Sequence, residues 1–500
     1  MASSLPPLAL LSVLLVVFPF SAPSPARSGA VVPRLPGFRG PLPFRLETGS
    51  AFRRLPFVSL PLSEPRMVAL IRLRGLFVVC SRRYVEVDEV KETEFFYYFI
   101  ESEGNPAEDP LLLWLTGGPR CSAFCGLVFE VGPLKFVSAK YNGSLPSLVY
   151  RPYSWTKVSN MIFLDSPVGS GFSFSRHAES YYDGGDISWS QYVYTFLIKW
   201  LVDHPKFLAN PLYIAGDSYA GKIVPIVAQQ VLNGIEAEKR PLLNLQGYVI
   251  GNPVTGEKID LNARVPFAHG MGIISDDFFK LIQRSCAGQD YRSPIDSQCE
   301  MCFDTFDEIL SEINRYNILE PKCALASPKP KTEGRRALKE EYLHLLEPPP
   351  TPALNCRNYA HILAYYWANT DNLTTHVSMQ GTVGEWKRCN YDLPYAMDIK
   401  SSIKHHLSVT SGGYRALVYS GDHDMLIPFV GTKQWTRSLN FSVVDNWRSW
   451  HVDGQVAGYA TTYSNNLTFA TVKGAGHTAA EYKNKECLAM IRRWLSHEPL

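Results

Sequence analysis

The sequence predicts an α/β fold, with a mostly parallel central sheet and helices on both of its faces. Short apolar runs that end in Gly, Asp or Pro recur along the chain, and segments with helical spacing separate them. Strands that alternate with helices are typical of a parallel sheet covered on both sides. The 500 residues, 46% hydrophobic and 19% charged, also supply enough apolar side chains for a large core.

The apolar runs are the expected strands, and the clearest amphipathic segment is an expected helix. In the segment 189–205 apolar side chains recur on one helical face, and Pro205 ends the pattern. That face consists of Val193, Phe196, Leu197, Trp200 and Leu201. The expected strands are FFYYFIE (95–101), PLLLWLT (110–116), NMIFLD (160–165), PLYIAGD (211–217), LQGYVIGN (245–252), RALVYSGD (415–422) and TFATVKGAG (468–476).

The domain organisation is predicted to be one α/β domain, residues 31–500, because the chain contains no internal repeat and no Gly/Ser linker. Between about 254 and 395 the alternation stops and cysteines gather, which indicates a helical, disulfide-rich insertion that forms a lid. Its segment 324–355 is rich in Lys, Glu and Pro and is an expected exposed linker. Residues 50–83 fit neither a strand nor a helix period, and we expect them to derive from a retained intron or a gene-model error.

The N-terminus and the cysteines indicate a secreted protein. Residues 1–30 contain an apolar run of roughly fourteen residues followed by small residues, the pattern of a signal peptide, and no later run is long enough to span a membrane. Ten cysteines in an exported chain indicate disulfides. Six of them lie close together: Cys286, Cys299, Cys302, Cys323, Cys356 and Cys389. Acceptor sequences for N-glycosylation occur at Asn142, Asn372, Asn440 and Asn466.

The charge excludes one class of partner. A formal net charge of +2 is no basic footprint for nucleic acid. The cysteines form no CxxC…CxxC pattern that would indicate zinc. We therefore expect neither a metal nor another cofactor, and no membrane contact once the leader is removed.

The stretch YIAGDSYAGK has the order of strand, sharp turn and helix start that a nucleophile elbow requires. Small residues at Gly216 and Ala220 let the strand and helix backbones approach, which leaves the hydroxyl of Ser218 exposed at the tip of the turn. A serine needs a base to remove its proton, and the base needs a carboxylate to fix its tautomer. The sequence therefore has to supply both partners.

His477 and Asp422 are the predicted partners of that serine. His477 follows a strand within the glycine-rich TVKGAGHTAAEY, and Asp422 ends the strand in LVYSGDHDMLIP. Open α/β sheets gather their sites at the carboxyl ends of the strands. The order Ser, Asp, His is that of α/β-hydrolases, so we expect an α/β-hydrolase fold with a Ser218–His477–Asp422 triad. The neighbouring His423 and Asp424 receive no catalytic role.

Five motifs in this order resemble the serine carboxypeptidase family: GGPxCS, DSPVGSGFSFS, GDSYAG, YSGDxD and KGAGHT. The similarity runs from about Leu35 to the C-terminus, apart from residues 50–83. It implies the same triad, with the backbone N–H groups of Gly118 and Tyr219 forming an oxyanion hole. The glycines of WLTGGPRCS would then let the backbone approach the substrate.

The resemblance also implies cysteine roles. Cys389 is similar to the family partner of Cys121, and the linker between Cys323 and Cys356 resembles a segment that some members lose by proteolysis, which leaves two disulfide-linked chains. Cys286 and Cys299 complete the set of expected disulfide cysteines. We expect at least one free thiol among Cys80, Cys125, Cys302 and Cys487.

Substitutions near the serine distinguish two activities within the family. Peptidases have Asn where Thr116 stands and Glu where Asp217 stands. In them this Glu shares a proton with a second carboxyl, here Glu130, and the group grips the substrate carboxylate together with the Asn and the adjacent glycine, here Gly117. Thr116 lacks the amide. The motifs look like those of the plant acyltransferase branch, which moves an acyl group from a 1-O-acyl-glucose ester to an acceptor alcohol.

Two alternatives stay open at this point. One is a serine carboxypeptidase that releases C-terminal residues from peptides. The other is an impaired family member, because Arg120 stands where the family has Gly, and a shifted turn would misplace the Gly118 donor. Arg120 could also face the solvent and matter little. The resemblance and the leader together imply the secretory pathway, ending in the vacuole or outside the cell.

Overall fold

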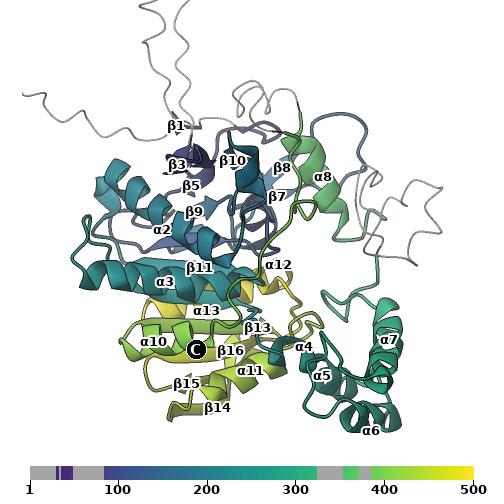
Figure 1. Ribbon diagram of the computed structural model, residues 1–500. Helices are drawn as coiled ribbons and strands as arrows, with labels where there is room; N and C mark the ends of the chain where they lie inside the picture. Colours follow the sequence, from purple (N-terminus) through teal and green to yellow (C-terminus); the bar gives the residue numbers. More distant parts are fainter. Residues whose placement is uncertain (1–29, 33–34, 49–83, 324–352, 371–383) are drawn as a thin grey trace, which may run out of the picture.

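The computed structural model describes residues 30–32, 35–48, 84–323, 353–370 and 384–500 (Figure 1). The predicted signal peptide, the 50–83 segment, most of the predicted linker and Asn372 lie outside these ranges, so they stay predictions. No helix of the described ranges is both long enough and apolar enough to cross a membrane.

A large mixed sheet forms the centre of the molecule. Its strands lie in the order β1-β2-β5-β9-β6-β11-β12-β13-β16-β15-β14. The neighbours from β9 to β16 pair in parallel, and the strands at both ends pair antiparallel. The predicted α/β class with a mostly parallel centre is confirmed. The bounds are β1 Ala30–Val31, β2 Leu46–Thr48, β5 Tyr97–Ile100, β6 Leu111–Leu115, β9 Asn160–Leu164, β11 Leu212–Asp217, β12 Leu245–Gly251, β13 Arg415–Gly421, β14 Val443–Val452, β15 Gln455–Tyr463 and β16 Leu467–Val472.

The two faces of the sheet bury separate sets of side chains. On β6, Leu112 and Trp114 point into one core, and Leu111, Leu113 and Leu115 into the other. This alternation is that of a strand covered on both sides. Helices α2 (Asp186–Asp203), α3 (Ala220–Glu236), α10 (Ile403–Ser411) and α11 (Phe429–Ser438) cover one face, and α8 (Tyr359–Ala368) and α13 (Asn484–Leu495) cover the other.

The run FFYYFIE differs from its prediction as a single strand. It splits into β4 (Thr93–Phe95) and β5, because the N–H of Phe96 donates to the Ser173 hydroxyl at 2.8 Å and leaves the first ladder. β4 belongs to a small sheet with β3 (Val85–Asp88) and β10 (Phe174–Ser175). A second small sheet pairs β7 (Leu134–Phe136) with β8 (Leu148–Tyr150).

In the region 254–395 the regular elements of the described residues are helices joined by turns and loops, and part of the region has its own apolar core. Helices α5 to α7 pack together around Phe306 and Leu310, and Figure 1 shows them beside the sheet and apart from α2 and α3. The bounds are α4 Ile259–Asn262, α5 Arg264–Gly270, α6 Asp276–Ser285 and α7 Ser297–Ser311. Its function as a lid remains a prediction. Short helices elsewhere are η1 Gly126–Glu130, η2 Trp155–Lys157, η3 Ala178–Tyr181, η4 Pro205–Phe207 and α12 Ala479–Tyr482.

Candidate active site

Ser218 lies in a strained turn between β11 and α3. Its φ is 53°, in the left-handed region that non-glycine residues rarely adopt, and its N–H donates to the Gly251 carbonyl at 2.9 Å. A Cβ at Gly216 would lie 2.5 Å from the Leu115 carbonyl oxygen, so only glycine fits beside β6. The turn therefore has the geometry of a nucleophile elbow.

His477 joins the serine to a buried carboxylate. Its Nε2 lies 2.7 Å from Ser218 Oγ, and its Nδ1 lies 2.8 Å from Asp424 Oδ2. The His477 N–H donates to the Tyr316 carbonyl at 2.7 Å, which anchors the loop after β16. The predicted contact between Ser218 and His477 is therefore present, and the chain of three groups has the arrangement of a catalytic triad.

The prediction that Asp422 is the acid is wrong, because Asp424 occupies that place. The Asp422 carboxylate instead lies 2.6 Å from His423 Nδ1 and accepts from the Gly474 N–H at 2.7 Å. Asp422 directly follows β13 and faces the loop after β16. The chain then turns within two residues, so that Asp424 points inward. Asp424 is completely buried.

Besides the imidazole, three further donors hold Asp424 in place. It accepts from the Asn252 side chain at 2.8 Å and from the Leu426 and Ile427 N–H groups at 2.8 and 3.3 Å. Sequence reasoning missed both Asp424 and Asn252. Asn252 follows β12 at the carboxyl edge of the sheet, and the rule that selected Asp422 could have selected it too.

The charges around the imidazole favour its protonated form. Burial of His477 opposes protonation, but the charge of Asp424 and its hydrogen bond outweigh burial, so the pKa of His477 lies above its ordinary value. An imidazolium that Asp424 stabilises is what a base needs at the moment it takes the serine proton.

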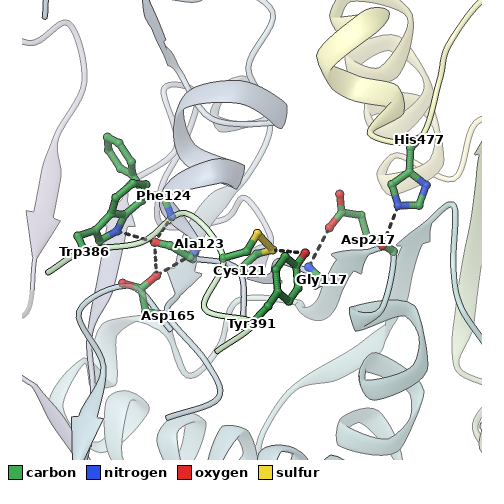
Figure 2. Close-up of a disulfide and its surroundings, with 12 residues drawn as sticks. Gly117, Cys121, Ala123, Phe124, Asp165, Asp217, Trp386, Tyr391 and His477 are labelled. Carbon is green, nitrogen blue, oxygen red and sulfur yellow. Dashed lines mark hydrogen bonds between the residues drawn. A yellow bond between two sulfur atoms is a disulfide. The ribbon is translucent and has the colours of Figure 1, made fainter. Parts of the chain in front are cut away.

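The loop that follows β6 packs directly on the serine turn. A Cβ at Gly117 would lie 2.7 Å from Ser218 Cβ and 2.8 Å from the Tyr219 nitrogen, so the two backbones touch. Gly118 has a φ of 120°, and Cys121 ties the loop to Cys389 by a disulfide. Figure 2 shows this loop beside Asp217 and His477. The predicted oxyanion residues Gly118 and Tyr219 thus lie on the two segments that meet here.

Arg120 does not face the solvent. Its side chain is only 1% exposed, its φ is 67°, and its Nη2 donates to the Tyr181 carbonyl at 2.8 Å. Within the described residues its Nε and Nη1 have no hydrogen-bond partner. Burial lowers the pKa of Arg120, and the neighbouring Tyr395 counteracts this. The guanidinium is thus part of the packing beneath the loop, which excludes the solvent-facing alternative.

Two buried carboxyl groups flank the serine turn. Asp217 accepts from the Gly117 N–H at 3.3 Å, and Glu130 accepts from Trp114 Nε1 at 3.2 Å. Burial raises the pKa of Asp217 to about 6; burial and the charge of Asp217 raise the pKa of Glu130 well above its ordinary value. Among the hydrogen bonds of the described residues, none joins the two carboxyls directly. The hydroxyl of Thr116, at the end of β6, is buried and has no partner within the described ranges.

A cavity of about 120 Å³, lined by both polar and apolar side chains, lies close to the triad, because Tyr316 and Thr478 belong to its lining. Tyr316, whose ring centroid is 5.9 Å from that of His477, forms part of its wall. Glu130, Arg388, Thr478 and Glu481 also line it, so it offers charges of both signs and hydroxyl groups. Within the described ranges no cluster of three or more His, Cys, Asp or Glu side chains could hold a metal ion.

Comparison with known proteins identifies the family. The family model for serine carboxypeptidases matches residues 81–497. The chain belongs to the serine carboxypeptidase family. Serine carboxypeptidase-like 19 of Arabidopsis thaliana is 42% identical over 478 residues, which cover 94% of this chain and 95% of that protein. Serine carboxypeptidase-like 17 of the same plant is 44% identical over 476 residues, which cover 95% of this chain and 94% of that protein.

A solved structure confirms the predicted α/β-hydrolase fold of this serine carboxypeptidase family member. A prohormone-processing carboxypeptidase from Saccharomyces cerevisiae superimposes with a TM-score of 0.66, over 91% of this chain and 92% of the yeast chain. The two sequences are 18% identical, so the likeness concerns the fold.

The cysteines of the described ranges form three disulfides. Cys121 pairs with Cys389, Cys286 with Cys299, and Cys323 with Cys356. Cys125, Cys302 and Cys487 are buried free thiols, in accord with the prediction of at least one, whereas Cys80 lies outside the described ranges. Asn142, Asn440 and Asn466 are exposed, as glycosylation requires.

Replacing Asp424 and Asp422 with asparagine, one at a time, tests which of them is the acid of the triad. Asp424→Asn should lower kcat by about a thousandfold or more, because the imidazole loses its charge partner and its tautomer. The acid limb of the pH–rate profile should also move to lower pH, because Asp424 is what raises the pKa of His477. The matched control Asp422→Asn should keep kcat within a few-fold of wild type. Steady-state ester hydrolysis measures both, and a large loss in the control alone would contradict the assignment.

Proposed function

We propose that this chain is an acyltransferase that moves an acyl group from a 1-O-acyl-glucose ester to an acceptor alcohol through an acyl-enzyme on Ser218. The observation that carries the proposal is the identity of Thr116. Its hydroxyl is buried and has no partner within the described residues. It stands in place of the Asn carboxamide with which peptidases of this family bind a substrate carboxylate. A site without that amide is better suited to a neutral ester than to a peptide C-terminus.

The geometry supports the first half of the reaction as follows. Ser218 Oγ attacks the ester carbonyl while His477 Nε2, at 2.7 Å, takes its proton. Asp424 stabilises the imidazolium, and the N–H groups of Gly118 and Tyr219 receive the developing oxyanion. The bond between the carbonyl carbon and the glucosyl oxygen then breaks, and glucose leaves with the proton from His477.

The second half repeats these steps with a different alcohol. An acceptor hydroxyl gives its proton to His477 and attacks the acyl carbon, and Ser218 Oγ leaves and recovers the proton. Hydrolysis would follow the same path with water, so triad geometry alone does not favour transfer. The cavity close to His477 supports transfer, because its charged and hydroxyl groups can bind a hydroxylated acceptor.

The alternative function is that of a serine carboxypeptidase, and the carboxyl pair favours it. At acid pH the raised pKa values keep Asp217 and Glu130 protonated, so they could donate to a peptide carboxylate. However, the shorter Asp217 makes no direct hydrogen bond to Glu130 in the described structure. This weakens the grip on a carboxylate that the peptidase reading requires.

An impaired enzyme is the least supported reading. Although Arg120 adopts a left-handed φ, the Ser218–His477 and His477–Asp424 distances remain 2.7 and 2.8 Å. The Gly117 backbone stays in contact with the serine turn. Both features favour a reactive serine.

We place the protein in the secretory pathway, in the vacuole or outside the cell. Three disulfides are consistent with an oxidising compartment. Because Cys323 and Cys356 are bonded, cleavage between them would leave two linked chains. Both the destination and this processing are part of the proposal.

A panel of 1-O-acyl-glucose esters, each with and without an acceptor alcohol, tests the proposed function. We expect a new ester and free glucose in equal amounts. Peptides with a free C-terminus should release little amino acid, as should peptides whose C-terminus is blocked. Release of C-terminal residues without any ester product would establish the peptidase instead. Ser218→Ala should abolish either activity, which excludes a contaminating enzyme.

Restoring the peptidase residues should shift the balance of activities. The double variant Thr116→Asn, Asp217→Glu should raise peptide hydrolysis relative to ester transfer by about tenfold, because it adds an amide and a longer carboxyl that reaches Glu130. The same ester and peptide assays measure the ratio. Thr255→Asn, buried elsewhere, serves as a control that introduces the same residue type and should leave the ratio unchanged.

The raised pKa of Asp217 also predicts how stability depends on pH. Because the folded state holds the proton to about pH 6 and an ordinary Asp releases it near 3.8, the folded state binds more protons between these values. The free energy of unfolding should therefore fall as pH rises from about 4 to about 6, by an Asp217 contribution on the order of 2 kcal/mol. Asp217→Asn should remove this contribution. The control Asp304→Asn, at an exposed position, should retain it. Denaturant unfolding at several pH values measures both.

A further inference from the structure

The loop after β6 lies next to a buried cluster centred on Asp186, the first residue of α2. Asp186 is completely buried. Its Oδ1 accepts from the hydroxyls of Tyr219 and Tyr395 at 2.8 and 3.0 Å, and its Oδ2 accepts from Lys222 Nζ and the Ile399 N–H at 2.8 and 3.1 Å. One carboxylate thus connects α2, the start of α3 and the segment 395–399.

Tyr219 is the residue after the nucleophile and carries one of the proposed oxyanion donors on its backbone. Its ring stacks on Trp189 at 6.3 Å between centroids with an interplanar angle of 3°, and meets Tyr395 edge-on at 5.7 Å. With its hydroxyl bound to Asp186, the side chain is fixed at both ends. Its backbone N–H can therefore move little relative to α2.

The other donor belongs to the loop after β6, and this loop reaches the same cluster through Arg120. The guanidinium lies 5.8 Å from the centre of the Tyr395 ring, whose hydroxyl binds Asp186. The Arg120 carbonyl accepts from the Asn390 N–H at 2.9 Å. The loop is therefore tied to Tyr395 two residues after Gly118.

Asp186 has more hydrogen-bond donors than a carboxylate at the start of α2 needs for charge balance. The helix start itself favours a negative charge, and Lys222 alone would neutralise Asp186. The two phenol hydroxyls add nothing to that charge balance; instead they direct the carboxylate toward the residues on either side of the proposed oxyanion hole. Burial raises the pKa of both phenols, with Asp186 adding to the effect, so both remain donors.

We infer that Asp186 is a positioning residue that fixes both halves of the oxyanion hole, through Tyr219 on one side and through Tyr395 and Arg120 on the other. The inference rests on the proposed function, because it assumes that Ser218 forms an acyl-enzyme. A shift of the donors by about 1 Å can cost about a hundredfold in rate. Loss of this anchoring should thus lower kcat without a comparable change in KM.

Removing single hydroxyl groups tests the role while the Asp186–Lys222 ion pair stays intact. Tyr219→Phe should lower kcat for 4-nitrophenyl acetate by about tenfold with KM within about twofold, and should slow labelling of Ser218 by a fluorophosphonate by a similar factor. Tyr395→Phe should have the same kind of effect, but smaller. Asp186→Asn is less suitable, because it leaves Lys222 buried without its counter-ion.

The matched control is Tyr192→Phe on α2, the helix that begins at Asp186. Its hydroxyl binds Asp88 at 2.7 Å, so this variant also loses one Tyr–Asp hydrogen bond, but on the part of α2 that packs against β3. It should lose similar thermal stability and keep the wild-type kcat. Equal kcat losses in both variants would mean general softening and would overturn the positioning role.

Two further outcomes separate this inference from the proposed function. If the wild-type protein reacts with the ester and the fluorophosphonate, and Tyr219→Phe reacts equally fast, only the positioning role fails. If the folded wild-type protein reacts with neither probe, the proposed acyl-enzyme and the positioning role fail together.

Discussion

The close approach of two backbones determines most of the geometry at this site. Gly117 lies against Ser218 and Tyr219 so tightly that a Cβ would come within 3 Å of both residues. That approach requires β6 and β11 to be parallel neighbours in register, with Leu115 opposite Gly216. It also requires glycine at both points of contact, and a left-handed turn at Ser218. The turn at Ser218, the loop after β6 and the contact of Ser218 with the His477 imidazole all depend on this arrangement.

Electrostatics at the site follow from burial more than from net charge. The chain has a formal charge of only +2, yet Asp217, Glu130, Asp424 and Asp186 are buried around the serine turn. Each has a different environment. Asp424 accepts three hydrogen bonds from Asn252 and two backbone groups besides its contact with His477, and Asp186 has Lys222. Asp217 and Glu130 are buried with few donors, and burial is the main cause that raises their pKa values.

Much of the fold and part of the site could be predicted from the sequence. Apolar runs of five to seven residues located the inner strands, because strands buried on both faces leave a continuous signal, as in Leu111–Leu115. Ser218 and His477 follow such strands, so their meeting at the sheet edge was predictable. The antiparallel hairpin of β14 and β15 was not predicted, because its exposed faces interrupt the apolar pattern. Choosing Asp424 over Asp422 required the path of a loop, which strand periodicity does not encode. The burial of Arg120 likewise depends on Tyr181 and Tyr395, which lie far along the chain.

The covalent link between Cys121 and Cys389 has a consequence for how the protein matures. The ring that it closes contains Ser218, whereas His477 and Asp424 come from the C-terminal part of the chain, outside that ring. The ring can therefore close before β13 and β16 have joined the sheet. At that stage the chain has a nucleophile but neither base nor acid in place, so the serine is chemically silent. Reactivity arises only when the last strands add to the sheet.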